Sequence, residues 1–221
     1  IVQISDLHCK NFGKNQSELI SKIKAAKPDM IALTGDIVDE DHDSISSVED
    51  LLKGIKDLAP IYFVTGNHEL TSLAATQYQE LLALFQKYGV TDLDNDSVKL
   101  KKGGQSITLY GRQYFSQYLT DSLPIASDKD FDILLYHGSD NFKEIAPYHY
   151  DLILSGHAHG GIVRLPIWGG IFGNDGTFFP EYAGGEYTIG DATLISSRGL
   201  GDASIPRFNN PPELVVIKLN P

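Results

Sequence analysis

The sequence predicts an α/β fold in which two mixed β-sheets pack face to face and helices cover their outer faces, giving a four-layer α/β/β/α sandwich. Three observations support this prediction. Short β-branched runs alternate with helical patterns over residues 1–90, and short strands with short connections dominate the rest of the chain. In addition, 42% of the 221 residues are apolar, which is enough to form a full core.

The first half of the chain alternates between strands and helices. Apolar side chains recur at helical spacing in three segments, for example at Leu51, Leu52 and Ile55, and each segment follows a short apolar run. The expected elements are strands over 1–4, 30–33 and 61–64 and helices over 17–26, 48–58 and 76–88. This βαβ order is typical of a mainly parallel sheet with helices outside it.

The second half predicts a second sheet. Its apolar runs are separated by short connections, and one sheet would not easily hold all of them together with the first three strands. The expected strands cover 106–110, 133–136, 152–154, 187–189, 193–195 and 214–219. The chain has neither a Ser/Gly/Pro-rich linker nor a repeat, so residues 1–221 are predicted to form a single domain.

Composition excludes several classes of protein. The chain carries 18 Lys and Arg against 29 Asp and Glu, a net charge of −11, whereas a protein that grips nucleic acid needs clustered basic side chains. The only cysteine, Cys9, rules out a disulfide framework and cysteine-based zinc clusters. The sequence has no run of about 18 apolar residues that could span a bilayer.

Acidic, histidine and glycine residues are concentrated directly after the predicted strands, where α/β folds build their sites. Five of the seven histidines follow apolar runs in this way, namely His8, His68, His137, His157 and His159. Asp6 precedes His8 by two residues. In extended chain this spacing directs a carboxylate and an imidazole to one face, where both can reach one ion.

Two further positions supply ligands of other kinds. Asp36, after the second strand, has two carboxylate oxygens that can bridge two cations, and Asn67, after the third, offers a neutral amide oxygen. Imidazoles, carboxylates and an amide without thiolate suit Mn, Fe, Zn or Co rather than an all-oxygen Mg or Ca cage. The sequence therefore predicts a metal centre at the strand ends.

Five motifs occur in order along the chain. They are Asp6-x-His8, Gly35-Asp36-x-x-Asp39, Gly66-Asn67-His68-Glu69, a lone His137 and Gly156-His157-x-His159. In this order they resemble the motif set of the calcineurin-like metallophosphoesterases, over residues 1 to about 161, and the ordered set is far more specific than any one motif. The glycine-rich tail from Gly160 to Glu213 resembles the bacterial membrane-associated or exported branch of that family.

The resemblance implies two divalent transition-metal ions and a role for each motif residue. Asp6, His8 and His159 would hold one ion, Asn67, His137 and His157 the second, and Asp36 would bridge them. Asp39 would orient these ligands, and His68 would contact the transferring phosphoryl group or protonate the leaving oxygen. The implied reaction is hydrolysis of phosphodiester or pyrophosphate-type bonds by a hydroxide that bridges the metals.

Two other functions stay open at this stage. A phosphomonoesterase could use the same two ions, and a noncatalytic scaffold could keep the fold for protein binding. A scaffold should tolerate loss of ligands, yet all seven ligand positions and His68 are present. The expected partner is a phosphate-ester small molecule or a lipid-linked substrate, with a membrane surface as a further partner and no protein partner implied. Nucleic acid is not expected, because the chain is acidic.

The start of the chain and its tail lead to an expectation about location. The sequence begins at Ile1, already inside an apolar run and without a methionine. Together with the resemblance of the tail, this predicts a native protein that is membrane-anchored or exported, with these residues as its soluble domain.

The residues beside the motifs are expected to have structural roles. Cys9 should point away from His8 and pack internally, and His42 should lie at the surface. The apolar stretch 165–172, which contains Trp168, is expected to be a loop packed on its own aromatic side chains; the alternative is an apolar lip beside the metals. Surface ion pairs, rather than contacts to substrate phosphate, are expected for Arg112, Arg198 and Arg207.

Overall fold

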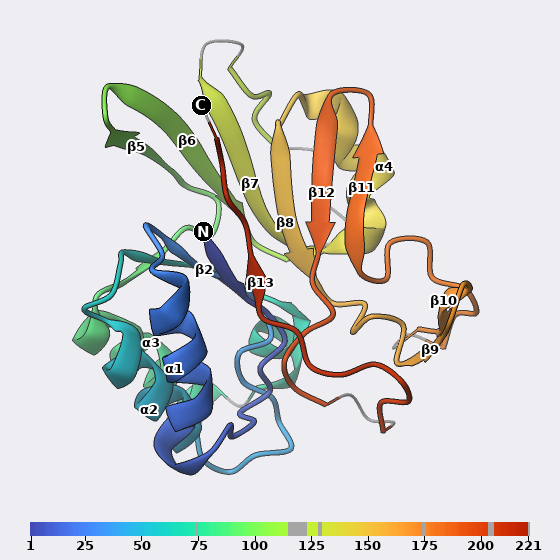
Figure 1. The fold of residues 1–221 in the computed structure, drawn as a ribbon. Helices are drawn as coiled ribbons and strands as arrows, with labels where there is room; N and C mark the ends of the chain where they lie inside the picture. Colours follow the sequence, from blue (N-terminus) through green and yellow to red (C-terminus); the bar gives the residue numbers. More distant parts are fainter. Residues whose placement is uncertain (74, 115–122, 128–129, 174–175, 203–205, 221) are drawn as a thin grey trace.

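The structure is a computed structural model that describes residues 1–73, 75–114, 123–127, 130–173, 176–202 and 206–220. Two β-sheets pack face to face (Figure 1). The first has the strand order β13-β1-β2-β3-β4, in which β1 to β4 are parallel and β13 pairs with β1 in the antiparallel direction. Its strands are β1 (Val2–Ile4), β2 (Ile31–Thr34), β3 (Ile61–Val64), β4 (Val90–Asp92) and β13 (Val215–Val216).

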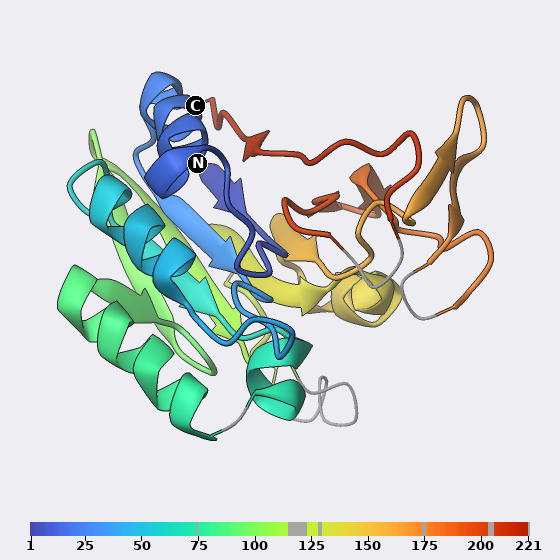
Figure 2. The same cartoon turned by 90° about the horizontal axis from the view of Figure 1, so that it is seen from below.

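The second sheet is also mixed, with the order β11-β12-β8-β7-β6-β5. Its four inner strands are parallel, whereas β5 and β11 pair with their neighbours in the antiparallel direction. The strands are β5 (Ser97–Lys102), β6 (Gln105–Arg112), β7 (Phe131–Gly138), β8 (Leu152–Gly156), β11 (Gly185–Ile189) and β12 (Ala192–Ser196). In Figure 1 the arrows of β8 and β12 point downward, so Figure 2, taken from below, looks onto their carboxyl ends.

Helices cover the outer face of each sheet. Three long helices, α1 (Ser17–Ala26), α2 (Ser46–Ile55) and α3 (Ala75–Tyr88), pack on the first sheet. The short helix α4 (Phe142–Ile145) packs on the second. In the described part of the chain, the other helical segments are the short turns η1 (Lys14–Gln16), η2 (His68–Ser72), η4 (Ser139–Asn141) and η5 (Ala146–Tyr148).

The alternation of side chains along the strands produces these layers. In β2, Ile31 and Leu33 pack among the residues of α1 to α3, whereas Ala32 between them joins the core between the sheets. In β7, Leu135 lies in that central core, whereas Tyr136 packs toward α4. Because side chains alternate across a strand, both faces of each sheet are buried. The four-layer α/β/β/α prediction is therefore confirmed.

The structure also differs from the expected elements. Helix α1 has the predicted bounds, and α2 begins and ends a few residues earlier than expected. The strand expected over 214–219 is confined to β13. In the two large sheets, the edge strands β4 and β5 were not predicted, because β4 has only three residues and β5 alternates apolar with exposed polar residues.

The stretch around Trp168 forms a β-hairpin instead of the expected irregular loop. Its strands are β9 (Val163–Leu165) and β10 (Gly169–Phe172), and the hairpin stands at the periphery in both views (Figures 1 and 2). The rings of Phe172 and Phe178 pack with centroids 5.4 Å apart, but the Trp168 side chain at the tip is 69% exposed. Within the described residues, no helix has the length and apolar character needed to cross a membrane.

Candidate metal centre

The predicted ligands all lie at or just beyond the carboxyl ends of five strands. Asp6 and His8 follow β1, Asp36 follows β2 and Asn67 follows β3. The remaining three belong to the second sheet: His137, His157 and His159. His137 is the penultimate residue of β7 itself, and the other two lie in the turn after β8. The face-to-face packing of the two sheets brings these ends together.

Several of these ligand candidates have a backbone in the left-handed region, which sets the direction of their side chains. Five ligand candidates have φ between 47° and 70°: Asp6, His8, Asp36, His157 and His159. Side chains other than glycine rarely adopt this conformation, and such strain is concentrated at functional sites. The expectation that Asp6 and His8 share one face of an extended chain is therefore wrong; they meet because the chain turns sharply after β1.

The donor atoms form two groups that share Asp36. In the first group, donors of Asp6, His8, Asp36 and His159 all lie within 4.8 Å of one another. In the second, the same holds for Asp36, His137 and His157. The Asn67 side chain joins the second group, because its Oδ1 lies 2.9 Å from His157 Nδ1. The structure thus brings together all seven residues, in the grouping that the family resemblance implies.

The shortest distances show donors facing one another across the centre. His8 Nε2 and His159 Nε2 are 3.2 Å apart, and His159 Nε2 lies 3.4 Å from Asp6 Oδ1. His137 Nε2 lies 3.0 Å from Asp36 Oδ2. His137 Nδ1 is 2.7 Å from the Thr34 carbonyl oxygen, to which it can donate. With that hydrogen bond formed, Nε2 is the ring nitrogen directed at Asp36, and it is the one that would coordinate a cation there.

The electrostatics of the centre favour a cation. Burial opposes charge on every group, yet His137 holds the pKa of the Asp36 carboxyl well below its usual range. Burial alone would lower the pKa of His137, but the Asp36 and Asp6 carboxylates outweigh it and raise the pKa of His137 to about 10. Burial lowers the pKa of His159 to about 3, so this imidazole is neutral, as a metal ligand must be.

The residues fit a divalent transition metal. Asp6 Oδ2 is buried and has no hydrogen-bond partner, which leaves a carboxylate oxygen available for coordination. Two glycines leave space for the carboxylates of the centre. A side chain at Gly156 would collide with the Asp6 carboxylate, and one at Gly66 would collide with that of Asp36. Cys9 is buried in the core beneath helices α1 and α2, and burial raises the pKa of its thiol to about 11. Its Sγ lies within 4.8 Å of donor atoms of Asp39 and His42, outside the two groups that share Asp36.

Glu69 organises the backbone around the bridging position. Its buried carboxylate accepts hydrogen bonds from four backbone N–H groups, those of Asp36 (2.9 Å), Ile37 (2.7 Å), Val38 (3.3 Å) and Gly66 (2.8 Å). The loop after β2 is thereby fastened to the loop after β3. The sequence placed Glu69 in a motif without giving it a role, although its position beside His68 was the available signal.

A pocket of about 300 Å³ opens over the first donor group. His8, His68 and His159 line it together with Lys10 and carboxylates that include Asp202. His68 is not among the clustered donors, in keeping with its predicted place beside the metals. Its backbone N–H donates to Asp36 Oδ1 at 2.9 Å, and its ring packs edge-on against the His8 ring, with centroids 4.8 Å apart.

Asp39 contacts the ligand set from outside, as predicted. Its Oδ2 lies 3.3 Å from His8 Nδ1, and its Oδ1 lies 2.6 Å from Nδ1 of His42. His42 is half exposed, so its surface placement is confirmed, but its ring is anchored to the metal centre through Asp39. The acidic loop after β2 thus forms part of the rim of the pocket.

The three arginines for which surface ion pairs were expected, Arg112, Arg198 and Arg207, have different partners. Arg198 forms the expected ion pair with Glu213, at 2.9 Å, and Arg112 donates to the neutral Asn95 side chain at 2.8 Å. The prediction of a surface ion pair is wrong for Arg207, whose guanidinium donates to the carbonyl oxygens of Gly201 (2.8 Å) and Arg198 (2.7 Å).

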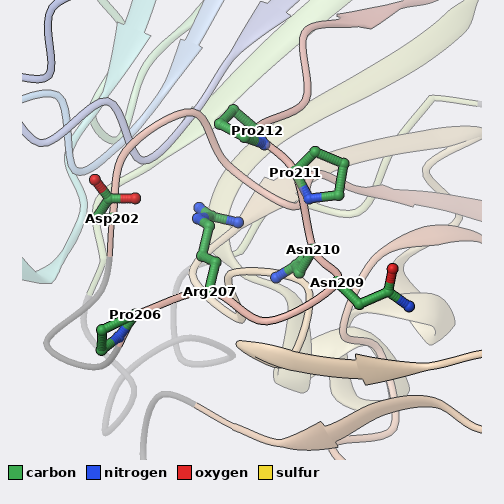
Figure 3. A pocket seen from close by; sticks show the side chains of 7 residues that line it. All are labelled: Asp202, Pro206, Arg207, Asn209, Asn210, Pro211 and Pro212. Carbon is green, nitrogen blue, oxygen red and sulfur yellow. The ribbon is translucent and has the colours of Figure 1, made fainter.

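Arg207 holds the loop after β8, which carries His157 and His159, in place. It also donates to the His159 carbonyl oxygen at 3.3 Å, and its Nη2 lies 3.2 Å from His159 Nδ1. Figure 3 shows it among the residues that line a second pocket, of about 680 Å³. With its donors directed at carbonyls, Arg207 fixes the loop after β8 and not a phosphate.

Comparison with known proteins agrees with this geometry. The family described as calcineurin-like phosphoesterase matches residues 1–161. Metallophosphoesterase YkuE of Bacillus subtilis is 30% identical to this chain, in an alignment that covers 99% of this chain and 78% of YkuE. Phosphodiesterase YaeI of Escherichia coli is 26% identical, and the alignment covers 99% of this chain and 81% of YaeI. In the structure of phosphopantetheinyl hydrolase from Mycobacterium tuberculosis, 89% of that chain matches 90% of this one with a TM-score of 0.53 at 11% identity, which shows a shared fold. With its ordered motifs and clustered donors, the chain belongs to the calcineurin-like phosphoesterase family.

Proposed function

We propose that this phosphoesterase hydrolyses phosphodiester or pyrophosphate-type bonds with two divalent transition-metal ions. The observation that carries the proposal is the membership of Asp36 in both donor groups, because a carboxylate with two oxygens can bridge two cations. The first ion would be held by Asp6, His8 and His159 and the second by Asn67, His137 and His157. Mn, Fe, Zn or Co suits this set, since it contains no thiolate.

The metals would supply charge neutralisation at the phosphoryl group and a water of lowered pKa. The chain supplies the rest. Arg207 and Glu69 hold the ligand loops in place, so that the donors are preorganised. His68, at the edge of the pocket and beside His8, would deliver a proton to the leaving oxygen.

The charge of the pocket supports a diester rather than a monoester. Three carboxylates, those of Asp39, Asp41 and Asp202, line the pocket, and Lys10 is held by Asp202 at 2.8 Å. A monoester carries up to two negative charges at neutral pH and a diester one, so this rim repels the monoester more strongly. The similarity to a protein named as a phosphodiesterase also supports this preference.

The test compares bis(p-nitrophenyl) phosphate with p-nitrophenyl phosphate, with added Mn²⁺ and after chelation. We expect the diester to be hydrolysed with the higher kcat/KM, the chelator to abolish turnover, and Asn67→Ala to reduce turnover by at least about 100-fold, since metal catalysis is worth several kcal/mol. A preference for the monoester would favour the phosphomonoesterase alternative. Undiminished turnover by Asn67→Ala or after chelation would refute the proposal, and protein that binds no metal would favour the scaffold.

We further propose that the substrate carries a lipid portion and that the β9–β10 hairpin rests on a membrane surface, in a native protein that is membrane-anchored or exported. Ile167 and Trp168 are exposed at its tip, and Phe178 and Phe179 are exposed nearby. The hairpin begins only a few residues after His159, and no acidic residue occurs between Asp151 and Asp175. Exposed apolar and aromatic side chains on a hairpin whose own residues include no carboxylate suit the bilayer interface.

Sedimentation with phosphatidylethanolamine and phosphatidylglycerol vesicles checks this expectation. Replacing Ile167 and Trp168 by Ser should weaken vesicle binding about tenfold or more, because burying one such side chain is worth about 1.5–3 kcal/mol. Ile125→Ser is the matched control, since Ile125 is similarly exposed but lies outside the hairpin. Equal binding by the hairpin variant and the control would count against the membrane contact.

A further inference from the structure

We infer that Glu40 is the positioning residue of His68: its carboxylate fixes the imidazole that protonates the leaving oxygen. The inference rests on the proposed function, in which His68 is the proton donor. Glu40 Oε2 lies 2.6 Å from His68 Nδ1. This is a short hydrogen bond to a carboxylate, the kind that holds an imidazole in one tautomer and one orientation.

Asp39, the carboxylate inside the recognised motif, is already engaged elsewhere. One of its oxygens faces His8 Nδ1 at 3.3 Å and the other faces His42 Nδ1 at 2.6 Å. Two successive carboxylates therefore serve different histidines: Asp39 supports a predicted metal ligand, and Glu40 supports the predicted proton donor. Because the residues are adjacent in the chain, the same loop after β2 orients both kinds of group.

Three contacts together determine the pose of His68. The backbone N–H donates to Asp36, the ring edge packs against the His8 ring at an interplanar angle of 89°, and Nδ1 is held by Glu40. With Nδ1 engaged, Nε2 is the nitrogen that remains to carry the transferable proton. His68 lines the pocket, and both side chains stay partly exposed, 20% for His68 and 45% for Glu40, so the leaving oxygen of a substrate can reach the imidazole.

Water is the second reactant of the hydrolysis. As the water oxygen bonds to phosphorus and the bond between phosphorus and the leaving oxygen breaks, the Nε2 proton moves to the leaving oxygen, and the proton that the attacking water releases restores the imidazolium. Glu40 stays ionised throughout and stabilises the cationic ring before the transfer. Without Glu40, the ring would rotate more freely and the donor would be less often aligned.

A leaving-group series tests the inference. Methyl aryl phosphodiesters with phenols ranging from p-nitrophenol to phenol are assayed with wild type, Glu40→Gln and His68→Asn in the presence of Mn²⁺. A poor leaving group needs the proton and a good one does not. We expect Glu40→Gln to reduce kcat for the phenyl ester about 10–100-fold. The factor of reduction for the p-nitrophenyl ester should be at least five times smaller, and the metal content should be unchanged. Glu40→Asp, which keeps the carboxylate, should be intermediate.

Asp43→Asn is the matched control, because it removes one charge from the same exposed loop. Two results would overturn the inference. One is that Glu40→Gln lowers kcat by the same factor for every leaving group. The other is that Glu40→Gln has wild-type activity while His68→Asn is defective. In both cases the metal-dependent function would stand. If His68→Asn and Asn67→Ala were both fully active, the proposed function itself would fall.

Discussion

Replacement of Asp36 by Asn is expected to reduce kcat/KM at least about a thousandfold and to lower the content of bound metal below the proposed two ions per chain. The carboxylate is the only donor residue common to both groups among the described His, Cys, Asp and Glu residues. Asn keeps an oxygen that can accept from the His68 N–H but loses the negative charge that, in the proposed function, bridges two cations. Loss of several kcal/mol of transition-state stabilisation corresponds to about three decades in rate.

The measurements are diester turnover with added Mn²⁺ and elemental analysis of the dialysed protein. Asp57→Asn is the control, since this carboxylate is 83% exposed and belongs to neither donor group. Its activity and metal content should equal those of the wild type. Two ions retained by Asp36→Asn together with full turnover would show that Asp36 does not bridge.

Glu69→Ala is expected to lower the free energy of unfolding of the metal-free protein by about 3–5 kcal/mol. The substitution leaves four backbone N–H groups without their acceptor, including those of Asp36 and Gly66. An unpaired buried donor costs about 1–3 kcal/mol, and water entering the space left by the side chain can recover part of the sum. A chain of this length should lose about 2–4 °C in Tm per kcal/mol.

Thermal unfolding is measured in chelator, because bound metal would stabilise the native state by mass action. Glu80→Ala, at an exposed position of α3, should change stability by less than about 0.5 kcal/mol. Glu69→Gln keeps one acceptor oxygen and should be intermediate. A Glu69→Ala variant as stable as Glu80→Ala would mean that the carboxylate does not fasten the two loops.

Local patterns along the sequence are sufficient to predict most of the fold. Helix α1 was predicted with its observed bounds because Leu19, Ile20 and Ile23 recur at helical spacing and one face must be buried. β5 was not predicted, because it is an edge strand whose alternate residues are exposed and polar. The pairing of β13 with β1 joins the two ends of the chain, and no local signal in the sequence reports it.

The order of the motifs also predicted which seven residues would lie together, since donors at the carboxyl ends of neighbouring parallel strands converge whatever the details of their loops. The turn that carries Asp6 and His8 was not predicted correctly. Its left-handed backbone is maintained by contacts with neighbouring loops, such as the His8 N–H donating to the Asp36 carbonyl at 3.1 Å.

The sequence by itself determined the layered architecture and the chemistry of the donors, because hydrophobic periodicity and residue type act locally. Only the tertiary structure decided which partner each polar group meets: Glu40 beside His68, Glu69 on the two loops, and Arg207 on the His159 loop. These hydrogen bonds join segments distant in the chain, and they form only where packing of the two sheets brings the segments within about 3 Å, the hydrogen-bonding distance.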